Sequence, residues 1–251
     1  MQPTLPPTLR AALLVAIGVP LMQLSRFDDA ERALREALPI LERIGSPQVA
    51  VLLNTLAVLL SWRAGPGASA EAAAFAARAL AHFERLGYAS GISAAADTLG
   101  YALQSLGRID EARAQFARAA TLGGPITECE ATAHLAALEL ARGRVDDARA
   151  LAQRHFGVAD RERLPVALRS AVLLAAGLCA REAAQQPRAQ RWLRALLAEA
   201  DLGFETRRSA QALLQRLAAA ADDDSAERMP FDAALEEVRA MWAEGSASGR
   251  A

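Results

Sequence analysis

The distribution of apolar and polar residues along this chain predicts helices and no sheet. Alternation with a period of two, the pattern of a half-buried strand, is hard to find anywhere in the sequence. Ala is the dominant residue, and the chain is 53% hydrophobic but only 5% aromatic. Because Ala combines the best helix propensity with a small side chain, we expect an all-helical protein of closely spaced helices.

A short pattern returns three times. "SRFDDA" occupies 25–30, "GRIDEA" 107–112 and "GRVDDA" 143–148. The last residue of each is Ala, and the two intervals are 82 and 36 residues. The longer interval is about twice 40, which indicates a further repeat hidden between the first two.

A second marker locates that repeat. "LERIG" ends at Gly45 and "FERLG" ends at Gly87, and related segments end at Gly123 and Gly203. The hidden repeat is therefore "SAEAAAFAARALAHFERLG", residues 69–87.

A third marker is a small residue inside an apolar run, 12 to 15 residues before a partner alanine. The small residues are Gly18, Ala57, Gly100, Ala136 and Gly177. The partners are Ala30, Ala72, Ala112, Ala148 and Ala189. Chance similarity in an Ala-rich chain would explain the alanines but not the glycine and acid positions. The period, about 36 to 44 residues, is typical of a helical solenoid.

Each unit is predicted to hold two helices. The first ends near a Gly or Ser, because a left-handed residue closes a helix well. The second opens with acidic residues, which suit the positive end of the helix dipole. We place the units at 9–45, 46–87, 89–124, 125–160 and 161–203, with a capping helix at 204–221.

The third unit, "DTLGYALQSLGRIDEARAQFARAATLGG" at 97–124, resembles the tetratricopeptide repeat. The matching positions are Leu99, Gly100, Gly107, Ile109, Ala112, Phe116 and Ala119. The resemblance covers roughly 9–203. The second unit departs from it with an insertion at 65–67, and the fourth has Ala152 in place of a large aromatic.

The period near 40 and the "ERLG" helix ends look like the sensor arrays of large bacterial transcriptional activators and signal-transduction ATPases. The resemblance implies a right-handed superhelical α-solenoid of about five helix-turn-helix repeats with C-terminal capping helices. It supplies only the array, since the sequence contains no GxxxxGK[ST] phosphate loop and no convincing helix-turn-helix for DNA.

Charge and cysteine content narrow the function classes. The formal net charge is −1, so there is no basic excess to neutralise a phosphate backbone, and direct nucleic-acid binding is not expected. Cys129 and Cys179 lie 50 residues apart and outside any ligand cluster. Reduced thiols in a cytoplasm are the expected state.

The N-terminal segment 11–25 carries no charge and resembles the apolar core of a signal peptide. It contains Pro20, has no small-x-small cleavage site after it and is short for a membrane span. We expect a buried first helix, and export or membrane anchoring is the less favoured alternative.

In tetratricopeptide arrays the first helix of each pair lines the concave face, where such solenoids bind their partners. The resemblance therefore implies a set of candidate contact residues. They are Asn54, Thr55, Trp62, Asp97, Thr98, Tyr101, Gln104, Glu130, His134 and Arg181.

The candidate residues include no Lys and hardly an Arg, so the groove does not suit an acidic C-terminal peptide. An amphipathic or mildly basic segment fits better, with Trp62 and Tyr101 as anchors. The alternative for Trp62 is packing against the insertion at 65–67, and for Tyr101 filling of the space between repeats.

No catalytic or metal site is predicted. His82, His134 and His155 fall in different predicted helices. Glu130 and His134 are four residues apart on one face, but a metal site needs more ligands. We therefore predict no cofactor and no enzymatic activity.

The C-terminal part is expected to form an acidic linker, an amphipathic helix and a disordered tail over 222–251. The segment 229–244 places Phe231, Leu235, Val238 and Trp242 on one helical stripe. This helix either covers the last repeat or docks in the groove as an autoinhibitor.

These observations together predict a cytoplasmic bacterial adaptor or scaffold that binds a protein or peptide in its concave groove. A ligand-sensing module of a transcriptional or signalling regulator and a membrane-attached assembly factor are the alternatives. An array with apolar ends is also able to form a homodimer.

Overall fold

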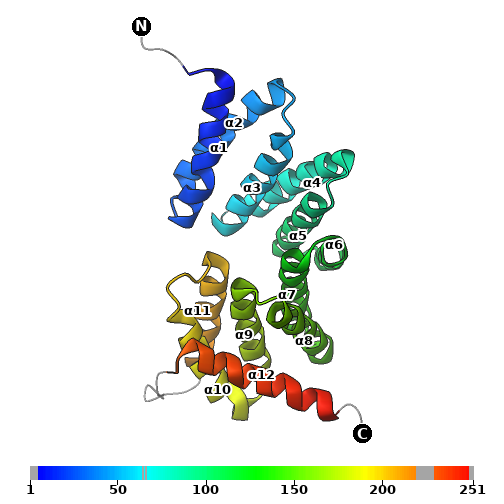
Figure 1. Cartoon of the computed structure of the whole chain (residues 1–251), viewed down its shortest axis with the longest axis vertical. Coiled ribbons are helices and arrows are strands. Elements are labelled where there is room, and N and C mark those ends of the chain that lie inside the picture. The colour runs from blue at the N-terminus through cyan, green and yellow to red at the C-terminus, as the bar shows by residue number, and fades with distance from the viewer. Residues whose placement is uncertain (1–4, 64, 66, 219–228, 249–251) are drawn as a thin grey trace. The chain divides into compact units, whose positions relative to one another are not determined.

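The computed structural model describes residues 5–63, 65, 67–218 and 229–248 (Figure 1). Every regular element in these ranges is helical, which confirms the all-α class. Five helix pairs follow one another along the chain. They are α1 (Pro7–Gln23) with α2 (Phe27–Arg43), α3 (Gln48–Arg63) with α4 (Ala68–Leu86), α5 (Ala89–Ser105) with α6 (Ile109–Leu122), α7 (Pro125–Ala141) with α8 (Val145–Arg161), and α9 (Pro165–Cys179) with α10 (Gln186–Leu197).

Three further helical elements lie outside these pairs. A 3₁₀ turn at Ala183–Gln185 precedes α10, and α11 (Phe204–Ala218) and α12 (Phe231–Ser248) follow it. The predicted acidic linker at 222–225 lies outside the described residues. The helix predicted within 229–244 is longer than expected, because α12 continues to Ser248, and the rest of the predicted disordered tail, 249–251, lies outside the described residues.

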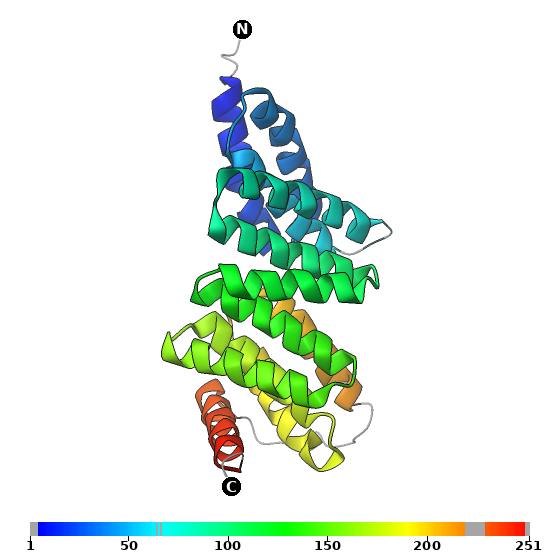
Figure 2. The ribbon, with the colours of Figure 1, turned by 90° about the vertical axis from the view of Figure 1, so that its right-hand side faces the viewer.

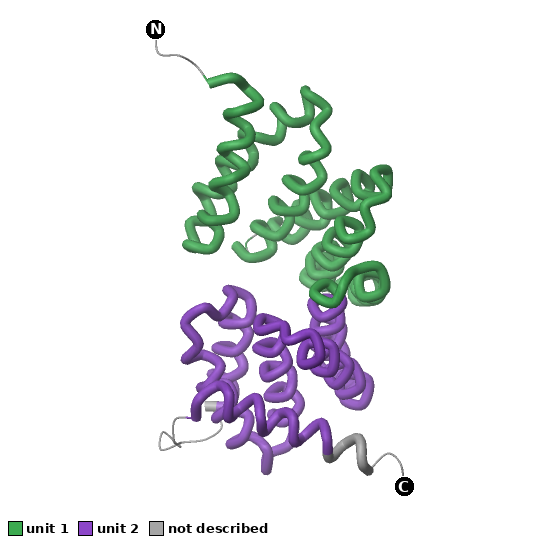
Figure 3. Tube along the Cα trace, in the orientation of Figure 1, with its two compact units in different colours: residues 1–127 green, residues 128–251 purple. Residues whose placement is uncertain are grey.

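Helix packing divides the chain into two compact units, residues 1–127 and 128–251 (Figure 3). The sequence placed the division at 221/222 instead. The C-terminal helix joins the second unit because α12 packs along α9 and α10 (Figures 1 and 2). In the first unit, consecutive helices from α1 to α6 pack against one another.

The turns inside the first, third and fourth pairs are each closed by a left-handed residue, as the repeated "GRIDEA" pattern predicts, whereas the turn of the fifth pair at 180–185 contains none. Gly107 has φ 75° and Gly143 has φ 77°. In the first, the amide of Gly107 donates to the carbonyl of Gln104, and that of Arg108 to Leu103. Ser25 occupies the same place with φ 58°, although it is not a glycine.

Two small residues of the third marker, Gly18 and Gly100, lie against the second helix of their own pair, while Gly177 of α9 faces Leu140 of α7. A Cβ added to Gly18 would lie 2.6 Å from a Leu34 methyl carbon, and one added to Gly100 would lie 2.8 Å from the Phe116 ring. All five partner alanines are buried. The repeat pattern is therefore a packing pattern, in which a missing side chain on one helix admits a large one from the other.

The acidic residues that open the second helix of a pair have a partner that the sequence did not suggest. No side chain caps the first turn of α2, α6 or α8 by a hydrogen bond. Instead the arginine of the motif pairs with the carboxylate three residues later. Arg26 Nε lies 2.8 Å from Asp29 Oδ2, and Arg108 Nε lies 2.7 Å from Glu111 Oε1.

The first helix is less buried than the sequence predicted. Ala11, Gly18 and Met22 are buried, while Leu9 and Leu13 on other sides of α1 stay exposed. The prediction was wrong because, among the described residues, only the sides of α1 that face α2 and α3 are packed. No helix among the described residues is long and apolar enough to cross a membrane.

Candidate functional site

The candidate contact residues of the first unit lie on two helices that touch each other, α3 and α5. These are the first helices of their pairs, as the resemblance implied. Six of the seven candidate side chains on them are partly exposed. They are Asn54, Thr55 and Trp62 on α3, and Asp97, Tyr101 and Gln104 on α5. The fold therefore brings residues 35 to 50 positions apart in sequence onto neighbouring helices of one unit.

The seventh candidate on these helices, Thr98, is buried, and its hydroxyl donates to the carbonyl of Ala94 at 3.0 Å. It therefore contributes packing and not a contact surface. The hydroxyl of Thr55 likewise donates to the carbonyl of Val51 at 3.0 Å, a common arrangement for Thr inside a helix.

Asn54 differs from its neighbours in the state of its carbonyl oxygen. The Oδ1 atom is buried and has no hydrogen-bond partner among the described residues. A buried acceptor without a donor costs free energy, typically about 1–3 kcal/mol. Asn54 is therefore a partly exposed side chain whose amide oxygen faces inward and is unsatisfied.

The remaining three candidates belong to the second unit. Glu130 is exposed on α7, and the His134 Nε2 atom lies 3.6 Å from Glu205 Oε1 of α11. Arg181 was misplaced by the sequence, because α9 ends at Cys179 and Arg181 follows in the turn. A guanidinium nitrogen of Arg181 lies near Gly143, in the turn between α7 and α8.

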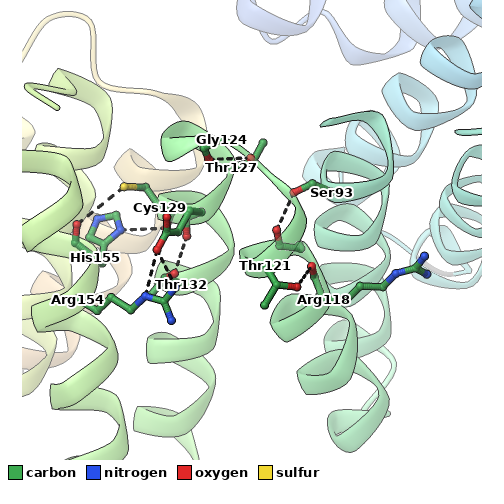
Figure 4. A network of polar contacts seen from close by, with 11 residues as sticks. Ser93, Arg118, Thr121, Gly124, Thr127, Cys129, Thr132, Arg154 and His155 are labelled. Atoms are coloured by element: carbon green, nitrogen blue, oxygen red, sulfur yellow. Dashed lines mark hydrogen bonds and ion pairs between the residues drawn. The ribbon is translucent and has the colours of Figure 1, made fainter. Parts of the chain in front are cut away.

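Sequence reasoning missed the role of His155, a buried residue that links three helices of the second unit (Figure 4). Its Nδ1 lies 2.9 Å from the Cys129 carbonyl oxygen. Its Nε2 lies 2.9 Å from both the Ala167 carbonyl oxygen and Ser170 Oγ. Desolvation lowers the pKa of His155, so the ring is neutral and structural at neutral pH.

Both thiols are buried and unpaired. Burial raises the pKa of Cys129 to about 11, and burial also raises the pKa of Cys179. Protonated thiols are poor nucleophiles and poor metal ligands, so neither cysteine has the environment of a reactive residue. No group of three or more His, Cys, Asp or Glu side chains that would suit a metal ion occurs in the described part of the chain.

The C-terminal stripe faces the last helix pair. Leu235, Val238 and Trp242 are buried in one cluster with residues of α9 and α10, and Phe231 packs against that cluster. In this arrangement α12 covers the last repeat, which is one of the two alternatives that the sequence left open for this helix; the other was docking in the groove.

Polar contacts hold α12 in that position, and no pattern in the sequence predicted them. Glu237 accepts a hydrogen bond from the Trp192 indole nitrogen at 2.9 Å. Two arginines of α10 flank the same carboxylate, Arg188 at 3.3 Å and Arg191 at 3.8 Å. The Arg188 guanidinium also lies 4.7 Å from the centroid of the Trp192 ring. The contact between α12 and α10 therefore combines apolar packing with complementary charges.

The comparisons with known proteins agree with this architecture. No protein-family model matches the sequence, and no curated protein matches it either. Among solved structures, the chain is similar to a Signal Transduction ATPase with Numerous Domains (STAND) protein with a tetratricopeptide repeat sensor, from Pyrococcus horikoshii. The TM-score is 0.57 at 13% identity, and the match covers 97% of this chain. It covers 38% of that protein, so the chain spans little more than a third of its neighbour.

The likeness concerns the fold. The chain has the helical-repeat fold of tetratricopeptide proteins, as the pattern in residues 97–124 implied, and folds of this class generally serve as interaction modules.

Proposed function

We propose that this protein is a non-catalytic protein- or peptide-binding module whose contact surface is the α3–α5 face of the first unit. The observation that supports it most is the set of partly exposed polar and aromatic side chains on two packed helices. Because the helices are ordered before binding, little conformational entropy of the site is lost when a partner binds.

The chemistry of this face suggests the kind of partner. Asp97 is the one charged residue among the six exposed candidates, and Trp62 and Tyr101 provide aromatic surface. The partly exposed amide side chains of Asn54 and Gln104 add hydrogen-bonding groups. An amphipathic or mildly basic segment with hydrogen-bond donors matches these features.

The test is affinity capture from native cytosol, read by mass spectrometry, followed by titration of the purified partner. The wild type is compared with the double variant Trp62→Ala/Tyr101→Glu. The matched control is Ala74→Glu/Ala77→Glu, which adds charge at exposed positions of α4 in the same unit. We expect the partner to be lost from the first variant and retained by the control, with helicity unchanged in both. Retention by all three would place the binding surface elsewhere.

A second candidate function is a ligand-sensing module of a signalling regulator. It is favoured by the solved neighbour, which carries a tetratricopeptide repeat sensor. A small-molecule thermal-shift screen distinguishes the two, since the melting temperature of a sensor rises with the concentration of the ligand that it binds. A cytoplasmic location is part of both proposals, and the two unpaired, buried thiols support it.

A further inference from the structure

The outer face of α1 is an apolar surface that the described residues leave uncovered. Leu9, Leu13 and Ile17, spaced four apart, are each 47% exposed. Ala12 and Ala16 lie beside them and are also exposed. A helix that is apolar on all sides is normally buried on all sides. The outer face of α1 is an exception, because its apolar side chains are exposed.

The repeat itself shows that this face is one the fold normally buries. Gly18 of α1 corresponds to Ala57 of α3, an offset of 39 residues. With that offset, Leu13 and Ile17 correspond to Leu52 and Leu56, which are 1% and 0% exposed. In α3 the second helix of the preceding pair, α2, supplies packing contacts. In the described part of the chain, no helix precedes α1.

We propose that a second copy of this chain covers the face, so that the protein forms a two-fold symmetric dimer through α1. A two-fold interface must be complementary to itself. The row Leu9, Leu13 and Ile17 forms a ridge, and the neighbouring row of Ala12 and Ala16 forms a shallow groove. The ridge of one copy fits the groove of the other, the common way in which helices pack.

Charge supports the same occupant. Residues 11–25 contain no charged side chain, so placing the face against itself brings no like charges together. Arg10, at the edge, is paired with Glu36 of α2. A membrane surface is a poorer match, because helices that lie on membranes carry basic residues along their polar face and α1 has none in this stretch.

Sedimentation velocity over a wide concentration range provides the first test. A 17-residue helix is about 26 Å long and covers less than the roughly 800 Å² per partner of a standard interface. We therefore expect a monomer–dimer equilibrium in the micromolar range. Leu13→Glu/Ile17→Glu should weaken it at least tenfold, since four carboxylates would meet at the axis. Val166→Glu is the control, because Val166 is an exposed apolar residue on α9, in the other unit.

Cysteine cross-linking provides a second test that does not depend on a destabilising charge. The native thiols are buried, so a single cysteine introduced by Ala16→Cys is the accessible one. Under mild oxidation it should form a disulfide-linked dimer, while Ala74→Cys on the exposed side of α4 should not. Circular dichroism establishes that each variant is folded.

Three results would overturn the proposal. They are a wild type that stays monomeric at every concentration, dimers that persist in Leu13→Glu/Ile17→Glu, and equal cross-linking of both cysteine variants. A monomeric wild type that co-sediments with anionic vesicles, and loses that property in the double-glutamate variant, would assign the face to a lipid surface instead.

Discussion

At the scale of single residues, the repeat consists of small residues that leave room for large side chains of the facing helix. A glycine is needed at position 100, because Phe116 and the Ala112 carbonyl oxygen occupy the space that the Cβ of any other residue would fill. Gly157, on α8, has no such neighbour within 4 Å. The two glycines therefore make opposite predictions for the same substitution.

Gly100→Ala should lower the free energy of unfolding by about 1–3 kcal/mol, because the added methyl group overpacks a fully buried contact. Gly157→Ala should raise it by about 0.5–1 kcal/mol, because alanine restricts the unfolded chain and favours a helix. Urea unfolding followed by circular dichroism measures both. An equal gain in both variants would show that α5 and α6 are not in close contact.

Two turns carry a side chain in a backbone conformation that favours glycine. Ser25 has φ 58° and Arg163 has φ 52°, where other turns of the repeat have glycine. Ser25→Gly and Arg163→Gly should each stabilise the fold by about 1 kcal/mol, because the left-handed conformation is strained for other residues. The converse variant Gly107→Ala should destabilise it. Thermal unfolding of the three variants checks the sign.

His155 makes a prediction about pH. Its folded-state pKa is lowered, chiefly by desolvation, so the unfolded chain binds the proton first as the pH falls. The stability that depends on the neutral ring is complete above the unfolded pKa of about 6.5 and declines below it. His155→Gln should cost about 1–3 kcal/mol at pH 7.5, because it disturbs a buried hydrogen-bond network. The deficit should shrink at pH 5.5. A constant deficit across this range would mean that the imidazole does not titrate in this way.

At the scale of elements, α12 is held by an apolar stripe and a carboxylate that faces two arginines and an indole. Glu237→Gln should lower the stability of the second unit by about 1–2 kcal/mol, because a hydrogen bond to a charged group is lost. Asp232→Asn, at an exposed position in the first turn of the same helix, is the control and should cost less, about 0.3–1 kcal/mol, because it removes only a charge near the helix N-terminus. Chemical unfolding of both variants provides the measurement.

The variant Val238→Asp tests whether α12 affects the affinity for a partner. A carboxylate at this fully buried position should detach the helix and lower the melting temperature. If α12 only covers the last pair, partner affinity stays the same or falls. An increase in affinity would instead establish autoinhibition, in which the helix and a partner compete.

At the scale of the whole molecule, two compact units predict two regions of distinct stability. In helical repeats, each pair depends chiefly on its neighbours. In hydrogen exchange, Val238→Asp should speed exchange in α9 and α10 and leave α1 to α4 unchanged. A uniform increase along the chain would show that the two units unfold together.

The helix pairs and their turns could be predicted because they depend on local and regularly repeated features. A left-handed turn needs Gly or a tolerated substitute, and a close contact needs a small residue at a fixed spacing, as at Gly18 and Gly100. Five repetitions made the signal visible above the background of an Ala-rich chain.

The candidate site could be predicted only in part. Trp62 and Tyr101 lie on helices that touch, as expected from the family pattern. Thr98 and Arg181 could not be placed correctly, since the rotation of α5 and the end of α9 depend on packing against neighbours. The link between Glu237 and Trp192 spans 45 residues and had no periodic signal.

The sequence alone thus determined the helical class, the repeat period and the close contacts at Gly18 and Gly100, because each is set by backbone geometry within about 40 residues. Only the tertiary structure decided which apolar residues are covered. Leu13 and Leu52 occupy the same place in the repeat, yet one is exposed and the other buried. The difference comes from a neighbouring helix that packs on one and not on the other, and burial is a property of that packing.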